Sequence, residues 1–107
     1  MALGDFEQLV LLAALHLGDE AYGVRIVDAI EERTGRKVSR SALYVTFDRL
    51  EGKGLLESDL RGGDETRGGK QRRYVTVTQA GLGALRESRA ALLGMWRGLE
   101  PVLKEEV

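Results

Sequence analysis

Cysteine is absent from this sequence of 107 residues, and histidine and proline each occur once. Without cysteine the chain can form no disulfide, thiolate metal site, iron–sulfur cluster or cysteine nucleophile. The single histidine, His16, excludes a multi-histidine metal site and leaves little for general-base catalysis. We therefore expect neither an enzyme nor a bound cofactor, and the simplest expectation for such a chain is a cytoplasmic protein.

Long apolar segments are also missing. The longest run, residues 9–15, is about a third of a membrane span. It follows Asp5 and Glu7 rather than a basic region, which is unlike a secretory signal peptide. The length of the chain predicts a single domain, and we expect no membrane partner.

The net charge of −1 hides an uneven distribution of charge along the chain. Residues 1–35 carry a balance of −5, whereas residues 36–53 and 61–73 each hold five basic and two acidic residues. The charge of the whole chain argues against a nucleic-acid partner. The two short basic segments argue for one, provided that they meet on one surface.

The apolar spacing predicts three helices, over residues 5–17, 21–34 and 40–53. Asp5 and Ser39 are the predicted N-caps of the first and the third, and Gln8 follows Asp5 in capping-box position. Gly35 stands where a left-handed residue would end the second helix.

The first predicted helix is apolar nearly all round. Its apolar residues fall on two sides, with Phe6, Leu9, Val10 and Leu17 on one and Leu11, Leu12 and Leu15 on the other. Such a helix must be covered on both faces. A partner subunit is the economical explanation in so small a domain, and a central helix in a monomer is the alternative.

The third predicted helix has two contrasting sides. Leu43, Phe47 and Leu50 recur at core spacing and define its buried stripe. The opposite arc, at about 100° per residue, carries Ser41, Tyr44, Val45, Asp48 and Arg49.

After residue 54 the period changes. Residues 55–60 and 72–77 read as two strands, joined by a segment with four glycines and no apolar side chain. Thr78 caps a last helix that begins at Gln79, with a leucine stripe repeating every seven residues, and a kink or fraying is expected near Pro101. We divide the chain into residues 1–78 and a C-terminal helix over residues 79–107.

Three helices followed by a two-stranded hairpin is the order of a winged helix-turn-helix, so the predicted fold is mainly α with a two-stranded β wing. In this arrangement the third helix enters the DNA major groove and the hairpin tip reaches flanking phosphates. The two basic segments coincide with that helix and that tip.

Three stretches of the chain resemble the PadR family of transcriptional regulators. Residues 21–26 (AYGVRI) resemble the start of that family's second helix, and residues 39–56 (SRSALYVTFDRLEGKGLL) resemble its recognition helix. Residues 68–81 (GGKQRRYVTVTQAG) resemble its wing and the start of its last helix. The resemblance covers about residues 4–90. It implies a dimer formed through the last helix, which represses a promoter until an effector arrives.

The candidate DNA-binding residues lie in the third helix and the hairpin. They are Ser39, Arg40, Ser41, Tyr44, Val45 and Arg49 in the helix segment and Arg67, Lys70, Arg72 and Arg73 in the hairpin. Arginine and lysine suit phosphates or guanine edges, and an exposed valine suits a thymine methyl group. The alternatives are packing for the tyrosine and solvated surface positions for the charged residues and the valine.

Asp48 shares the exposed arc, where it would repel phosphates. Either it pairs with a neighbouring arginine or the helix is tilted on DNA, and the sequence leaves both options open.

The last helix offers a second candidate site, made of Leu92, Met95, Trp96 and Leu99. At helical spacing with the leucines, Trp96 fits a dimer interface. Alternatively, two symmetry-related Trp96 rings could stack a planar aromatic effector. The sequence therefore predicts a homodimeric transcriptional repressor that binds double-stranded DNA and is released by a small effector. The alternative is a winged-helix protein-interaction module that does not bind DNA and whose basic patch meets an acidic partner.

Overall fold

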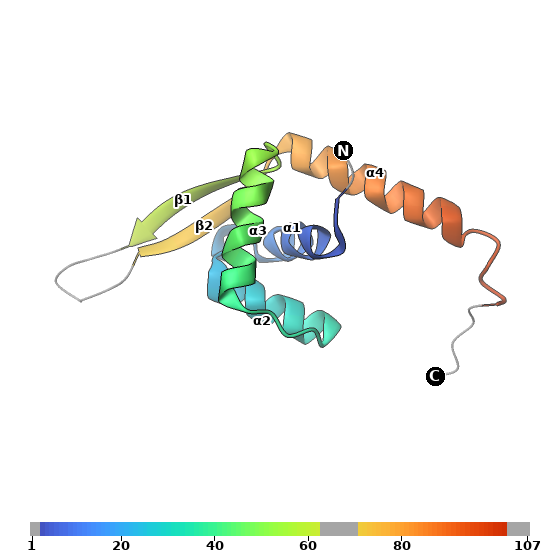
Figure 1. Cartoon of the computed structure of the whole chain (residues 1–107), viewed down its shortest axis with the longest axis horizontal. Coiled ribbons are helices and arrows are strands. Elements are labelled where there is room, and N and C mark those ends of the chain that lie inside the picture. Colours follow the sequence, from blue (N-terminus) through green and yellow to red (C-terminus); the bar gives the residue numbers. More distant parts are fainter. Residues whose placement is uncertain (1–2, 63–70, 103–107) are drawn as a thin grey trace.

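A computed structural model of the chain describes residues 3–62 and 71–102. The elements, in chain order, are α1 (Asp5–Leu17), the 3-10 turn η1 (Gly18–Glu20), α2 (Gly23–Thr34), α3 (Arg40–Gly52), β1 (Leu56–Gly62), β2 (Gln71–Val77) and α4 (Gln79–Trp96) (Figure 1). The predicted fold class, mainly helical with a two-stranded antiparallel sheet, is confirmed.

Two of the three predicted N-caps are confirmed. The Ser39 hydroxyl accepts a hydrogen bond from the Ala42 amide at 3.2 Å, and the Thr78 hydroxyl accepts one from the Gly81 amide at 3.0 Å. The prediction for α1 is wrong, because its N-cap is Gly4 rather than Asp5. The Gly4 amide donates to the Glu7 carboxylate at 2.9 Å, so an acidic residue inside the first turn satisfies the free amide.

The second helix begins two residues later than predicted. Residues 18–20 form η1, and Tyr22 is extended and bridges to Tyr74 of β2. Gly35 ends α2 in the left-handed region with φ 74°, as expected.

The hairpin extends further than the predicted strands. Its antiparallel register runs from Leu56 opposite Val77 to Gly62 opposite Gln71. At the base of the hairpin, the Val75 amide donates to the Ala21 carbonyl at 2.9 Å, which attaches β2 to the segment before α2.

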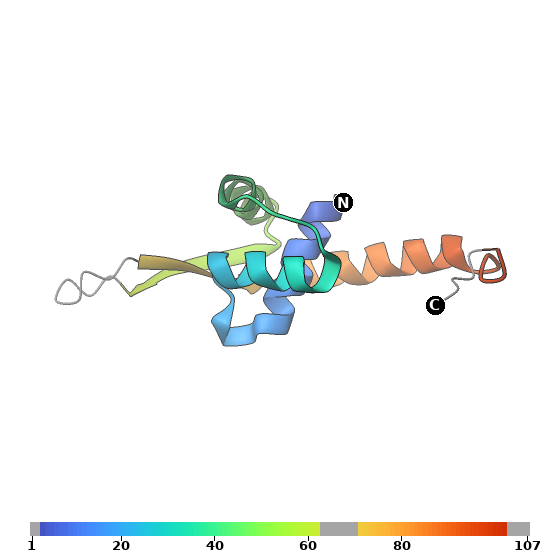
Figure 2. The ribbon, with the colours of Figure 1, turned by 90° about the horizontal axis from the view of Figure 1, so that it is seen from below.

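The core joins α1, α2, α3 and the base of the hairpin. Leu43, Phe47 and Leu50 are fully buried, which confirms the predicted stripe of α3. The largest fully buried side chains are Phe47, Leu11, Ile26, Leu43, Leu50 and Val10. The hairpin and α4 extend from opposite ends of this core, so the molecule is elongated, with extents of 59 × 32 × 21 Å (Figure 2).

The last helix touches the core only through its first turns. Gly81 and Ala84 are its buried residues, whereas residues 89–102 are exposed. The helix ends at Trp96, ahead of the break expected near Pro101, and Gly98 follows with φ 93°, a left-handed value that favours glycine. In residues 3–62 and 71–102, no helix is both long and apolar enough to cross a membrane.

Candidate nucleic-acid interface

Helix α3 stands out from one side of the molecule, between the hairpin and α4 (Figure 2). Because its buried stripe faces the core, the opposite arc is exposed. The exposed residues on α3 include the predicted Arg40, Ser41, Tyr44, Val45 and Arg49, together with Asp48. The helix thus presents polar and basic side chains on a protruding surface.

The N-terminal end of α3 suits an anion. Backbone amides at a helix N-terminus lack intrahelical partners, and the helix dipole is positive there. Arg40 and Ser41 occupy this first turn and are exposed. The Ser39 hydroxyl is already engaged as the cap, and it lies 3.4 Å from the Ser41 hydroxyl. Arg40 is therefore an exposed basic side chain at the end of the helix that suits an anion.

Tyr44 lies at the contact between α3 and the start of α2. Its ring meets Phe47 edge-on, with centroids 5.7 Å apart, and 36% of the residue remains exposed. Its hydroxyl sits over Gly23, where an added Cβ would come within 2.7 Å of the hydroxyl oxygen. Tyr44 thus packs against the domain and also presents a face to solvent.

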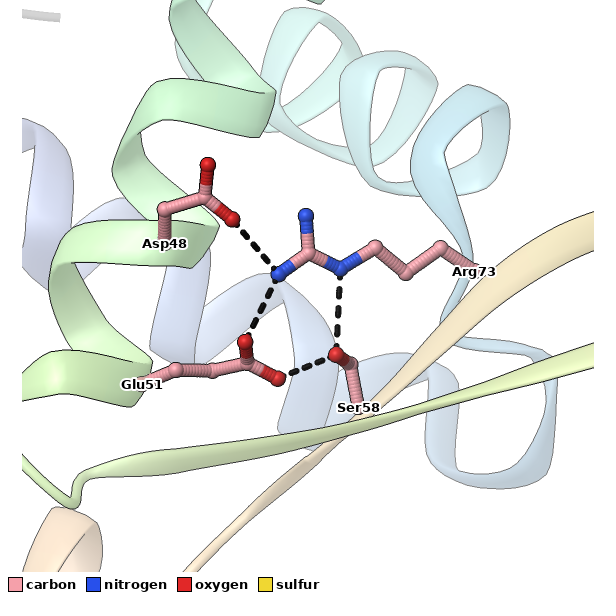
Figure 3. A network of polar contacts seen from close by, with 4 residues as sticks. All are labelled: Asp48, Glu51, Ser58 and Arg73. Carbon is pink, nitrogen blue, oxygen red and sulfur yellow. Dashed lines mark hydrogen bonds and ion pairs between the residues drawn. The ribbon is translucent and has the colours of Figure 1, made fainter.

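Arg73 faces α3, in contrast to the expected free contact with phosphate. Its Nε donates to the Ser58 hydroxyl at 3.0 Å, and one Nη donates to Asp48 at 2.9 Å and to Glu51 at 2.8 Å (Figure 3). Ser58 also donates to the Glu51 carboxylate. Asp48 is therefore paired with an arginine, which is one of the two options that the sequence left open.

Arg72 lies on the other face of the hairpin, because successive side chains in a strand point to opposite sides. Its guanidinium lies 4.7 Å from the ring centroid of Tyr22. Arg61 is its direct partner in the register and lies 4.4 Å from the ring centroid of Tyr74. The two tyrosine rings pack together with centroids 5.1 Å apart.

Arg61 is a candidate contact that the sequence analysis missed. Its signal was the hairpin register, which places it opposite Arg72 on an exposed face. Its Nε also donates to Asp59 at 2.8 Å, and this hydrogen bond, partly offset by desolvation, raises its pKa above the ordinary value. Arg67 and Lys70, the other two hairpin candidates, lie outside the described residues.

Lys53 and Arg36 belong to the first basic segment but contact the domain itself. Lys53 donates to both oxygens of Glu7, at 2.8 and 3.0 Å, and joins the end of α3 to the start of α1. Arg36 lies 5.2 Å from the ring centroid of Phe6. The positive charge of this segment is thus only partly available on the exposed arc of α3.

Glu7 itself is buried, with 6% of its surface exposed. Desolvation raises its pKa, but the hydrogen bonds from Lys53 and the Gly4 amide and the charges of Lys53 and Arg49 outweigh that effect. The net result is a pKa below the ordinary value.

A second surface lies between α1 and α4. It is a mainly apolar groove of about 580 Å³, lined by Gln8, Leu12, Leu15, Leu82, Leu85, Arg86, Arg89, Leu92, Leu93 and Trp96. Of the candidates predicted there, Leu92 and Trp96 line the groove, whereas Met95 and Leu99 lie outside its lining and are exposed. In the part of the chain that the structure describes, no cluster of histidine or carboxylate side chains could hold a metal ion.

The fold and the protruding third helix define a winged helix-turn-helix protein. Residues 11–87 match the family described as "Transcriptional regulator PadR-like family", and the chain belongs to that family. It is 41% identical over 78 residues to the transcriptional regulator Rv3488 of Mycobacterium tuberculosis, a match that covers 72% of this chain and 68% of the relative.

Solved structures agree with this assignment. A PadR family transcriptional regulator from Eggerthella lenta is 32% identical, with a TM-score of 0.69 over 92% of this chain and 84% of that protein. A PadR family regulator from Clostridium difficile, 22% identical, shares the fold with a TM-score of 0.72 over 94% and 99% of the two chains. The family and these relatives are transcriptional regulators, which confirms the prediction that the chain is not an enzyme.

Proposed function

We propose that this chain is a sequence-specific DNA-binding regulator, in which α3 reads the major groove and the hairpin contacts flanking phosphates. The observation that carries the proposal is the exposed arc of α3, which protrudes beside the hairpin while the buried stripe anchors the helix in the core (Figure 2). Membership of a family of transcriptional regulators supports the same function.

Each contact follows from the geometry of the exposed arc. Arg40 and Ser41 sit at the positive end of α3 and suit a phosphate, with Ser39 capping the helix beside them. Val45 is 55% exposed and suits a thymine methyl group, while Tyr44 and Arg49 flank it.

The hairpin supplies phosphate contacts through the face that carries Arg61 and Arg72. Arg67 and Lys70 belong to the same proposal on sequence grounds alone. Such contacts fix the position of the protein on DNA and carry little sequence information.

We further propose that the chain acts as a homodimeric repressor, with residues 79–107 as its dimerisation segment. Leu12 and Leu15 of α1 are 44% and 46% exposed, and Leu92 and Leu93 of α4 are 52% and 47% exposed. A contiguous apolar surface of this kind is uncommon on soluble monomers. A second copy that covers the groove would bury both helices, as the all-round apolar pattern of α1 requires.

A small effector that releases DNA is the last part of the proposal. The groove volume falls in the range typical of small-molecule sites, about 300–1,000 Å³. Trp96, which is 51% exposed, lines the groove and offers a flat aromatic surface. The alternative role of Trp96 is packing in the dimer interface, and the variant Trp96→Ala distinguishes it from effector binding.

A fluorescence-anisotropy titration tests the proposed DNA binding. Purified protein is titrated against a random-sequence duplex at two salt concentrations, and an operator is selected from a random pool. Binding that weakens by orders of magnitude over a few-fold rise in salt supports the proposal, because phosphate contacts release counterions. Absence of binding to any duplex would favour a protein-interaction module whose basic surface meets an acidic partner.

A further inference from the structure

Arg73 joins both strands of the hairpin to the recognition helix, as Figure 3 shows. Three of its five N–H groups are engaged, one with Ser58 of β1 and two with Asp48 and Glu51 of α3. Its guanidinium carbon lies 5.3 Å from the ring centroid of Phe47, and only 20% of the side chain is exposed. The contacts therefore enclose the guanidinium between two elements.

We propose that Arg73 is a positioning residue that sets the angle between the wing and α3, and so the fit of both to one operator. The inference rests on the proposed DNA binding and adds a specificity-determining residue that touches the recognition helix rather than DNA.

The position of Arg73 along the hairpin supports this role. At the base of the hairpin, Val75 is tied to the segment before α2. Arg73 lies two residues further out, and beyond it residues 61–62 and 71–72 are exposed. A two-stranded hairpin is only marginally stable by itself. An anchor at Arg73 fixes the direction in which the projecting part leaves the domain.

The charges of Asp48 and Arg73 also support this positioning role. Asp48 lies on the exposed arc of α3, and 71% of its side chain is exposed. An uncompensated carboxylate there would repel DNA phosphates. Arg73 neutralises part of this charge from the side while leaving the face of the helix open.

Arg73→Lys is the decisive variant. Lysine keeps the positive charge but has a single nitrogen, which cannot reproduce donation from both Nε and Nη in a planar fork. We measure the affinity for an operator duplex, selected from a random pool with the unmodified protein, and for a scrambled duplex of the same composition. The ratio of the two affinities is expected to fall about fivefold or more, within the range of couplings between contacting residues.

Arg33→Lys is the matched control, because Arg33 is an exposed arginine in the last turn of α2, outside the residues proposed to bind DNA. Its affinity ratio is expected to stay unchanged, since the same substitution is made away from the contacts of Arg73. An Arg73→Lys variant that keeps the unmodified ratio would overturn the inference.

Glu51→Gln gives a second test, because a positioning role of Arg73 and a direct phosphate contact of Arg73 predict different affinities for this variant. If Glu51 helps to hold Arg73 in position, its loss lowers the affinity ratio although one negative charge is removed from the interface. If Arg73 instead contacts phosphate, the same variant frees the guanidinium, and binding to both duplexes tightens with no loss of discrimination. The second result would contradict the inference.

A measurement without DNA separates this inference from the proposed function. In urea unfolding, Arg73→Gln and Glu51→Gln are compared singly and together. Each single variant is expected to lower the folding equilibrium constant. The double variant should lower it by about fivefold less than the product of the two single reductions, because both variants break the same contact. Independent effects would overturn the anchor even if the protein binds DNA. If the unmodified protein binds no duplex, the proposed function is refuted, and with it the role of Arg73 in specificity. Coupling between Arg73→Gln and Glu51→Gln would in that case still show that Arg73 anchors the hairpin to α3.

Discussion

Arg72 and Arg73 are neighbours in the chain and face opposite sides of the hairpin. One stacks on Tyr22, and the other binds two carboxylates of α3. The physical cause is the alternation of side chains along a strand, which places the two arginines on opposite faces. In the sequence they belong to the same basic segment. Tyr44 and Glu7 similarly owe their roles to partners that are distant in the sequence.

Glu7 is expected to stabilise the fold in a pH-dependent way. Its pKa is lowered in the folded state, so its contribution is fully present above the unfolded value near 4.5 and is lost as the pH falls through the folded pKa. Glu7→Gln should lower the free energy of unfolding at pH 7 by about 1–2 kcal/mol, because the partly exposed Lys53 loses its ionised partner.

Urea unfolding between pH 7 and pH 3 measures this effect. The gap between the unmodified protein and Glu7→Gln should narrow toward acid. Glu57→Gln, which changes an exposed carboxylate of β1, is the control and should change stability little. A gap that is constant with pH would contradict the assigned role of the ion pair.

We expect that glycine is required at position 23, because the Tyr44 side chain packs directly against it. An alanine Cβ would come within 2.7 Å of the Tyr44 hydroxyl and 3.3 Å of Cζ, so the ring must move. In a helix the same change otherwise stabilises by about 0.5–1 kcal/mol. Gly23→Ala should therefore lower operator affinity, and addition of Tyr44→Phe should relieve the contact and recover stability.

Thermal unfolding and operator titration check this prediction. Gly52→Ala is the control, because no atom of the described residues lies within 4 Å of the Cβ that it adds at the end of α3. Equal behaviour of Gly23→Ala and Gly52→Ala would show that the close approach to Tyr44 has no consequence.

At the scale of elements, the proposed function divides recognition between a helix and a hairpin that differ in what they can read. Helix α3 is rigid and presents several side chain types, whereas the described outer part of the hairpin offers Arg61 and Arg72 on one face. A helix in a groove can read base edges, while a basic hairpin suits phosphates.

Replacing both Arg61 and Arg72 with glutamine should weaken binding to operator and random DNA alike. Each lost phosphate contact should make the negative slope of log K against log salt less steep by about 0.9. Titrations at several salt concentrations measure the slope for the double variant and for the unmodified protein. A changed sequence preference at unchanged affinity would assign base reading to the hairpin instead.

At the scale of the whole molecule, α4 extends away from the core (Figure 1). Its outer part carries exposed apolar side chains, among them Leu92, Leu93 and Trp96. The proposed DNA-binding surface and the apolar groove lie on different parts of an elongated molecule, so a second copy could cover the groove without blocking α3. Two copies would then place two recognition helices on half-sites separated by about one helical turn.

Leu92→Glu should dissociate the proposed dimer, because it places a charge in the groove. Sedimentation at micromolar concentration should change from a dimer to a species of 11.8 kDa, and operator affinity should fall with it. Leu60→Glu is the control for the sedimentation measurement, where it should leave the dimer intact, since Leu60 is a similarly exposed leucine on the hairpin, outside the groove. An unmodified protein that sediments as a monomer would contradict the proposal.

Trp96→Ala distinguishes the two roles proposed for this residue. If Trp96 packs in the interface, truncation should weaken the dimer by about 3–5 kcal/mol. If it lines an effector site, the dimer and DNA binding should persist, while fluorescence quenching and DNA release by planar aromatic ligands disappear. Dimer dissociation constants and ligand titrations decide between the roles, and the dimer measurement is expected to favour packing.

Much of the local structure followed from the sequence alone. The stripe of Leu43, Phe47 and Leu50, the caps at Ser39 and Thr78 and the change of period after α3 depend on residues that are close in the chain. The prediction for the cap of α1 was wrong, because the N-cap is Gly4, whose amide donates to the Glu7 carboxylate. The resemblance to the PadR family could also be found from the sequence, because its motifs are patterns of residues that are close in the chain.

The sequence by itself determined which elements form and to which family they belong. Tertiary structure alone decided which charged residues remain available to a partner. Lys53 meets Glu7 across 46 residues, and Arg73 meets Glu51 and Asp48 across 22 and 25 residues. Local periodicity states which side of an element is apolar but not which distant charge lies opposite a given side chain, because packing of the folded elements sets those distances.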